Sequence, residues 1–259
     1  MSEYLDRLFG LSGKVAVLTG GGGHLCGELA RGLARAGAAV WVLDVRPAKS
    51  EAVASSIRDE GLEAHALAMD VTDRGAWERA LSEIVRRSGG VDVLVNGAGI
   101  NAPTPPLEIT LDEWRGIFAV NVEGTLLGCQ IVGAHMLERG GGSIINISSA
   151  SSGPPLSKAF AYSASKAAVR NLTQNFAREW ATRGVRVNAL RPGFFPTAWS
   201  RKHFITPERE RAILGHTPMA RYGEPSELVG CVIWLASPAS SFVTGAEIAV
   251  DGGFSAMTI

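Results

Sequence analysis

The chain has 259 residues, of which 46% are apolar, and its 25 basic side chains balance its 25 acidic ones. That length and apolar content suit one α/β domain over residues 1–259, with a core between two helix layers. A neutral chain without a basic stripe is not expected to bind nucleic acid. No uninterrupted apolar run approaches the ~18 residues of a membrane span, so we expect no membrane partner.

Three widely spaced cysteines, Cys26, Cys129 and Cys231, form no CxxC pair, which argues against a zinc site or a disulfide framework. We therefore expect buried thiols in a reducing compartment, and no metal. Residues 1–11 lack the apolar stretch of a signal peptide, so the sequence predicts a cytoplasmic protein.

Short apolar runs alternate with longer amphipathic stretches along the whole chain. The predicted strands, in chain order, are residues 15–18, 38–43, 64–69, 91–95, 143–147, 185–190 and 246–250. The predicted helices are residues 25–36, 48–59, 73–87, 111–138, 159–182 and 226–236. Strands that are apolar on both faces are typical of a parallel sheet covered by helices. We predict a single-domain α/β fold of the Rossmann type, with a doubly wound parallel sheet of seven strands.

Residues 192–225 show no regular pattern and are too long for an ordinary connection. Long loops within compact domains are usually functional. We therefore predict that this segment is a substrate-binding loop or lid.

The predicted strands end in small or polar residues, and ligands bind at those ends in this architecture. Gly20–Gly23 follow the first strand and open a helix, so the backbone there can approach a pyrophosphate. Asp44 ends the second strand, where its carboxylate can accept hydrogen bonds from both ribose hydroxyls of NAD and repel a 2′-phosphate. Arg46 could soften that repulsion, so NADP is an alternative to the predicted NAD.

Tyr162 and Lys166 are four residues apart in a predicted helix and share one face. A free tyrosine has a pKa of roughly 10, and a cation about 4 Å away could lower that pKa by up to about three units. Because Ser148-Ser149 ends the preceding strand, the arrangement favours an acid–base tyrosine working near neutral pH. A solvated pair on the helix surface would show the same spacing.

Taken together, these motifs resemble the short-chain dehydrogenase/reductase family over the whole length of the chain. The matching segments occur in the family's order: Thr19-Gly20, Asn96-Gly97-Ala98-Gly99, Asn121, Ser149, Tyr162-x-x-x-Lys166 and Pro192-Gly193. The resemblance implies an NAD(H)-dependent enzyme that interconverts a secondary alcohol and a ketone.

The same resemblance implies a catalytic role for four residues. Tyr162 would exchange a proton with the substrate oxygen, and Ser149 would hydrogen-bond that oxygen. Lys166 would lower the pKa of the tyrosine and hold the nicotinamide ribose. Asn121 would anchor a water that links Lys166 to solvent.

The cofactor contacts that follow from the glycine turn, the strand ends and the resemblance are Gly20, Gly23, His24, Leu25, Asp44, Asp70, Val71, Asn96, Gly97, Ala98, Tyr162, Lys166, Pro192, Gly193 and Thr197. Of these, Asp70 and Val71 would line the adenine pocket, and Thr197 would contact the carboxamide. The chain departs from the family's T-G-x-x-x-G-x-G pattern, because His24 and Cys26 replace its second and third glycines. We expect His24 to bind or shield a phosphate and Cys26 to need extra room between helix and strand.

For the substrate, a fork-shaped arginine suits a carboxylate, and Arg201-Lys202 follow soon after Thr197. The predicted substrate contacts are Asn101, Ser149, Tyr162, Phe194, Arg201 and Lys202, with His203 as a further hydrogen-bonding group. Two segments, Phe194-Phe195 after Pro192-Gly193 and His216-Thr217-Pro218-Met219, are also similar to family members that act on sugar acids such as mannonate and fructuronate. That similarity favours a sugar acid or a polyol.

Alternatives remain at this point. Phe194, Phe195 and Trp199 equally suit an apolar pocket in an NADP-linked ketone reductase, with Arg209 and Arg211 as solvated helix residues. A non-catalytic nucleotide-binding regulator is a remote third possibility. The resemblance also implies a homotetramer, in which an exposed Trp234 or Phe242 would find its partner.

Overall fold

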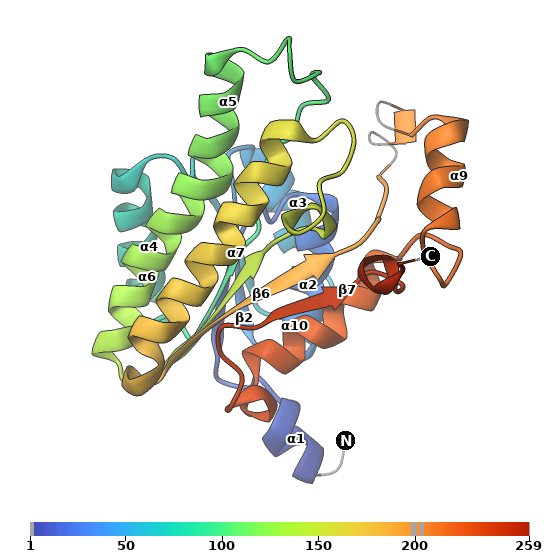
Figure 1. The fold of residues 1–259 in the computed structure, drawn as a ribbon. Coiled ribbons are helices and arrows are strands. Elements are labelled where there is room, and N and C mark those ends of the chain that lie inside the picture. The colour runs from blue at the N-terminus through green and yellow to red at the C-terminus, as the bar shows by residue number, and fades with distance from the viewer. Residues whose placement is uncertain (1–2, 198–200, 203–204, 259) are drawn as a thin grey trace.

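The computed structural model describes residues 3–197, 201–202 and 205–258. Its centre is one parallel sheet of seven strands in the order β3-β2-β1-β4-β5-β6-β7 (Figure 1). The strands are β1 Val15–Thr19, β2 Ala39–Asp44, β3 Ala64–Ala68, β4 Val93–Asn96, β5 Gly142–Ile147, β6 Val185–Pro192 and β7 Glu247–Val250. This confirms the predicted doubly wound Rossmann-type sheet, and each predicted strand lies within three residues of the observed one.

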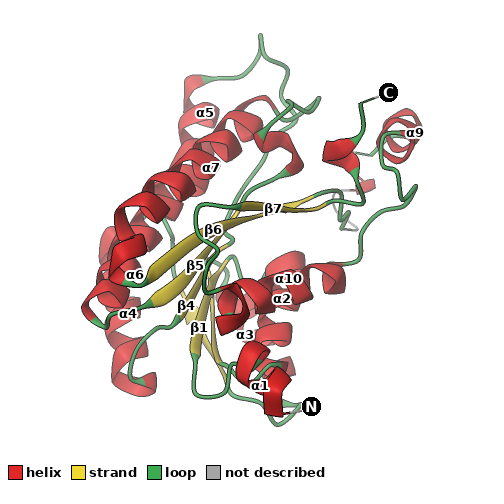
Figure 2. Cartoon of the chain, turned by 60° about the horizontal axis from the view of Figure 1, so that its bottom comes forward, coloured by secondary structure: helices red, strands yellow, loops and turns green. Residues whose placement is uncertain are grey.

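Helices cover both faces of the sheet, as Figure 2 shows edge-on. One layer consists of α2 His24–Arg35, α3 Pro47–Arg58 and α10 Val229–Ala236. The other consists of α4 Arg74–Ser88, α5 Leu111–Phe118, α6 Gly124–Glu138 and α7 Phe160–Trp180. Two further helices, α1 Glu3–Phe9 and α9 Pro207–Gly215, lie outside these layers.

A hydrophobic core lies on each face of the sheet, between the strands and one helix layer. Alternate residues of the same strand point into the two cores. In β1, Ala16 and Leu18 pack into the core on the α2 side, whereas Val15 and Val17 pack into the core on the α6 side. Successive side chains of a strand point to opposite faces. Both faces of the sheet are therefore buried, which explains why the strands are continuous apolar runs.

The predicted helix over residues 111–138 contains an irregular turn. A π-helical segment, η1 Ala119–Glu123, separates α5 from α6 and carries Asn121. Single π-turns within helices occur frequently at functional sites. Residues 111–138 are also long and apolar enough to cross a membrane by length and composition, although polar residues interrupt their apolar stretches. They pack on β4 and β5 and bury Val132 and Met136, as a core helix does.

The segment 192–225, predicted to have no regular structure, contains the helix α9. Thr206 caps the first turn of α9, because its side chain accepts a hydrogen bond from the Arg209 amide, and Pro207 occupies the first helical position. Both features favour a helix start. The described part of the segment therefore includes a helix, α9, beside the carboxyl end of the sheet.

Candidate active site

The carboxyl ends of β1 and β4 meet where the glycine turn begins. The Thr19 hydroxyl accepts hydrogen bonds from the amides of Gly97 (3.1 Å) and Ala98 (3.3 Å). Gly20 has a φ of +63°, and a Cβ there would lie 2.9 Å from the backbone of Ala98. Glycine is required here both for its backbone conformation and for the close approach of the two turns.

Beside these turns lies a cleft, which we call the cofactor cleft. It is lined by residues that include Gly20, Gly23, Leu25, Cys26, Arg46, Gly97, Gly99, Ile147, Tyr162, Lys166 and Pro192. At its floor α2 begins with an exposed His24, and the N-cap residue Gly23 offers no side chain to the amides of the first turn. Amides at such a helix start suit a diphosphate.

His24 and Cys26, which replace the second and third glycines of the family's glycine motif, place their side chains in different surroundings. His24 points to the surface, whereas Cys26 is buried with its sulfur against Gly97. The extra room that Cys26 was expected to need is therefore supplied by Gly97. Burial raises the pKa of the Cys26 thiol to about 12.

Asp44 ends β2 next to the cleft-lining Arg46, and its side chain is only 3% exposed and is not among the residues that line the cleft. Its carboxylate accepts hydrogen bonds from the Gly22 amide (3.2 Å) and from the Arg46 amide and Nε (3.0 Å each). The Arg46 side chain is 59% exposed and borders the cleft. The carboxylate is thus held both by two backbone amides and by the guanidinium of Arg46.

Tyr162 and Lys166 share one face of α7, as predicted. Lys166 Nζ donates to the Ile147 carbonyl (2.6 Å) and lies 5.7 Å from the centroid of the Tyr162 ring. Burial lowers the pKa of Lys166 to about 8. Burial also raises the pKa of Tyr162, and the interaction with Ser149 only opposes that rise. The expected lowering of the tyrosine pKa by Lys166 is therefore absent from the protein alone, because desolvation of both groups dominates.

Ser149 and Asn121 approach this pair from two other segments. Ser149 Oγ accepts hydrogen bonds from the Ser151 amide (3.2 Å) and hydroxyl (3.0 Å). The Asn121 amide binds both backbone groups of Ile100 (2.8 and 3.0 Å) and donates to Ser165 Oγ (2.9 Å). The π-turn thus ties the loop after β4 to α7.

Three predicted cofactor residues follow their strands as expected, but their side chains have other partners. Asn96 Nδ2 donates to Asn146 Oδ1 in the core (2.9 Å). Asp70 accepts from the amide and hydroxyl of Thr72, and Val71 is buried against α6. None of the three is among the residues that line the cleft.

A second hollow, the substrate cavity, adjoins the first and shares Tyr162 with it. It is lined by residues that include Asn101, Ser149, Leu156, Tyr162, Gly193, Phe194, Phe195, Ile205, Arg209 and Ile213. Gly193 is fixed beneath it, because its amide donates to Val250 and a Cβ there would strike Asp251. Thr197 follows on the same segment, and its carbonyl accepts from the Arg201 amide (2.9 Å).

Arg201 and Lys202, the predicted carboxylate ligands, do not line this cavity. Both are exposed, and Arg201 lies 4.0 Å from Glu210 and stacks over the Tyr222 ring at 5.0 Å. Arg209, treated in the alternative reading as a solvated helix residue, lines the cavity instead. The Thr206-Pro207 helix start was the signal that could have placed it. His203 and Trp199 lie outside the described residues.

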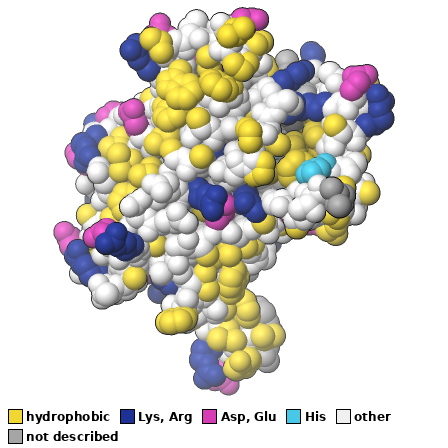
Figure 3. All heavy atoms as spheres, in the orientation of Figure 1, with side chains coloured by type: hydrophobic (Ala, Val, Ile, Leu, Met, Phe, Trp, Pro, Cys, Tyr) yellow, Lys and Arg dark blue, Asp and Glu magenta, His cyan; other side chains and the backbone are white. Residues whose placement is uncertain are grey.

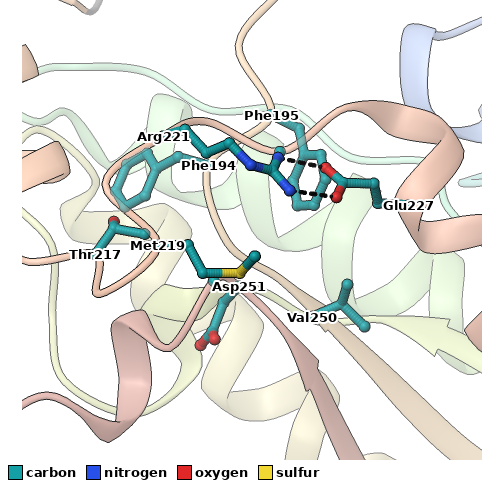
Figure 4. Close-up of a pocket in the computed structure, with 10 residues that line it drawn as sticks. Phe194, Phe195, Thr217, Met219, Arg221, Glu227, Val250 and Asp251 are labelled. Carbon is teal, nitrogen blue, oxygen red and sulfur yellow. Dashed lines mark hydrogen bonds and ion pairs between the residues drawn. The ribbon is translucent and has the colours of Figure 1, made fainter.

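The C-terminal part of segment 192–225 lies at a neighbouring hollow (Figure 4). Arg221 makes a two-pronged ion pair with Glu227, with contacts of 2.6 and 2.8 Å. Phe195 packs so closely against Gly223 that a Cβ on residue 223 would clash with the Phe195 ring. Phe194 and Phe195 therefore form a wall between this hollow and the substrate cavity.

Comparison with known proteins agrees with this geometry. A family model described as enoyl-(acyl carrier protein) reductase matches residues 25–255. The chain belongs to the short-chain dehydrogenase/reductase family. It is therefore an oxidoreductase that acts on CH–OH groups with a nicotinamide cofactor, which sets aside the non-catalytic alternative.

Relatives within the family are similar over nearly their whole length. Galactitol 2-dehydrogenase (L-tagatose-forming) of Cereibacter sphaeroides is 41% identical, covering 95% of this chain and 97% of the relative. The crystal structure of a gluconate 5-dehydrogenase from Burkholderia cenocepacia, in complex with NADP and tartrate, has a TM-score of 0.94 at 38% identity, covering 99% of this chain and all of that one. That of a putative D-mannonate oxidoreductase from Haemophilus influenza, with bound NAD, has a TM-score of 0.90 at 34% identity, covering 96% and 97%.

Proposed function

We propose that this enzyme interconverts a secondary alcohol and a ketone on a polyhydroxylated substrate, a sugar acid or a polyol. The observation that carries the proposal is the position of Tyr162, which borders both the cofactor cleft and the substrate cavity. A proton donor placed there could reach a substrate oxygen in the substrate cavity while the cofactor cleft would hold the nicotinamide. The names of the relatives that act on gluconate and galactitol support the substrate class.

We assign the chemistry of the reaction to four side chains of this chain. The nicotinamide, when bound, supplies or accepts the hydride. Tyr162 gives a proton to the ketone oxygen or takes one from the alcohol, and Ser149 holds that oxygen by a hydrogen bond. Lys166, with its ammonium at the Ile147 carbonyl in the cleft, would hold the ribose and, with cofactor and substrate in place, would stabilise the tyrosinate. Asn121 ties the loop after β4 to α7 and so keeps that loop in place beside Tyr162 and Lys166.

The residues of the cleft fit the cofactor. The turn Gly20–Gly23 and the uncapped start of α2 would hold the diphosphate, with His24 and Leu25 at its edge. A Cβ on Gly99 would stand 3.6 Å from Lys166 Nζ, so glycine leaves the space beside that ammonium open. The turn residues Gly97 and Ala98 would border the nicotinamide end, together with Pro192, Gly193 and Thr197. Adenine contacts by Asp70 and Val71 would come from the backbone.

We also propose that NAD is preferred over NADP. Asp44 is buried and held by the Gly22 amide, so it stays in place to accept hydrogen bonds from a free ribose. A 2′-phosphate would meet this fixed carboxylate. The relatives with bound cofactor include both NADP and NAD complexes, so the preference rests on Asp44 alone.

A cytoplasmic homotetramer is part of the same proposal. Hydrophobic side chains gather over α5 and the start of α7 (Figure 3), where Leu111 is 68% exposed and Phe160 49%. Phe242 is fully exposed next to β7, whereas Trp234 is half-buried and its indole donates to the Ala239 carbonyl. Sedimentation of the wild type and of Phe242→Ser tests this assembly; a monomeric wild type contradicts it.

The function is tested by NAD reduction with gluconate, galactitol, a hydroxysteroid and a 3-hydroxyacyl thioester at matched concentrations. We expect turnover of the gluconate or the galactitol only. Phe194, Phe195 and Ile213 also give the cavity apolar walls. If only the steroid or the thioester is oxidised, the polyhydroxylated substrate is wrong and the apolar-ketone alternative holds.

A further inference from the structure

Arg209 differs from its neighbours in its electrostatic partners. Arg191, Arg201, Arg211 and Arg221 each face a glutamate, at 3.2, 4.0, 3.6 and 2.6 Å respectively. Arg209 has no carboxylate partner among the described residues. No carboxylate of the described residues therefore offsets its charge, and burial at the cavity wall lowers its pKa.

The guanidinium of Arg209 instead binds neutral groups of Ser157, the residue after the cavity-lining Leu156. Nη1 donates to Ser157 Oγ (2.6 Å) and Nη2 to the Ser157 carbonyl (2.8 Å). Ser157 belongs to the loop between Ser149 and α7, whereas Arg209 lies in the first turn of α9. This contact joins the lid helix to the catalytic loop while using two of the five donors of the guanidinium.

A hydrogen-bond acceptor lies in the wall of the same cavity. Asn101 Oδ1 is buried and has no partner within the described ranges. A buried amide oxygen without a partner is costly unless a ligand supplies a donor. A cationic fork and an unused acceptor around Tyr162 together suit a ligand with a carboxylate and hydroxyl groups.

We propose that Arg209 is the carboxylate-binding and specificity-determining residue of this enzyme, and that Asn101 accepts a hydrogen bond from a hydroxyl of the same substrate. The proposal rests on the proposed function and narrows its substrate class to hydroxy acids. The contact with Ser157 holds the lid over the cavity, so the guanidinium binds the carboxylate only where the reacting carbon lies at Tyr162. Arg201 and Lys202, on the surface, serve no such role.

The test compares gluconate with gluconamide, which has the same hydroxyls and no charge. A hydrogen bond to a charged group contributes roughly 1.5–3 kcal/mol, which corresponds to about a 10- to 100-fold effect. Arg209→Met should therefore lower kcat/KM for gluconate by about 10- to 100-fold and for gluconamide by less than about threefold. Arg209→Lys should recover part of the loss, and Arg211→Met, on the same helix and paired with Glu208, should change neither.

Equal losses on both compounds in Arg209→Met would show a merely structural lid contact and overturn the proposal. So would a selective loss in Arg201→Met instead. Calorimetric measurement of gluconate binding to the enzyme–NADH complex distinguishes failure of the proposed reaction from failure of the proposed role of Arg209. Binding that depends on Arg209 without turnover means that the proposed reaction is wrong, whereas turnover without charge selectivity means that Arg209 is wrong.

Discussion

The sulfur of Cys26 occupies the space that a side chain at Gly97 would need, since a Cβ there would lie 2.2 Å from Sγ. Gly97→Ala should therefore destabilise the protein by about 1–3 kcal/mol, the usual cost of overpacking. Cys26→Ala should relieve part of this cost, because the Thr19 carbonyl, 2.9 Å from the same Cβ, stays in place. A double-mutant cycle of urea unfolding measures the coupling between the two positions. Additive effects would mean that the thiol is not what excludes a side chain at Gly97.

Tyr162→Phe should bind NADH normally and lose most turnover. General acid–base catalysis contributes about 10²- to 10⁴-fold, and the phenylalanine ring keeps the packing while removing the proton donor. NADH titration by fluorescence and single-turnover kinetics check both statements. Near-normal turnover in Tyr162→Phe would contradict the assignment of Tyr162 as the acid–base catalyst.

Lys166 gives the stability a predictable dependence on pH. Its pKa is about 8 in the folded protein and 10.5 ordinarily, so between these values the unfolded chain binds more protons. The free energy of unfolding attributable to Lys166 therefore rises with pH. From pH 7 to 9 the wild type should gain about 1 kcal/mol relative to Lys166→Met. Urea unfolding of both proteins measures the difference, in which the cysteines common to both largely cancel; a pH-independent difference contradicts the prediction.

Asp44 and Arg46 should control the choice of cofactor in opposite directions. Asp44→Ala should tighten NADPH binding and weaken NADH binding, because it removes the ribose acceptor and the repulsion of a 2′-phosphate. Arg46→Met should weaken NADPH binding more than NADH binding, since the exposed guanidinium is the cation nearest to Asp44. Dissociation constants for both cofactors decide this. A wild type that binds NADPH more tightly than NADH would contradict the preference for NAD.

Glu247 should act on Ser149 through its neighbours. Its carboxylate accepts from Ser148 (2.6 Å) and Ser152 (2.7 Å), which flank Ser149, and pairs with Arg191. Glu247→Ala should cost about 3 kcal/mol of stability, because buried donors lose their acceptor, and should lower kcat more than it raises KM. Glu247→Gln keeps an acceptor and should recover most of kcat. If neither variant changes kcat, Glu247 has no positioning role.

The sheet, the glycine turn and the Tyr162/Lys166 pair were predictable from the sequence. Each depends on local spacing: apolar runs set the strands, a strand end followed by glycines sets the turn, and a four-residue interval sets a shared helix face. The order of motifs along the chain then indicated the family. The structure retains these features because a parallel sheet brings the carboxyl ends of all its strands to one edge.

The choice of substrate residues was decided only by the tertiary structure. Arg201 and Arg209 look alike in the sequence, yet the capped start of α9 places Arg209 in the wall of the cavity that Tyr162 also lines and leaves Arg201 against Glu210 on the surface. The raised pKa of Tyr162 likewise follows from burial by distant segments. The desolvation of a side chain and the direction in which it points depend on which segments pack together in the folded protein. No local pattern of residues in the sequence specifies that packing.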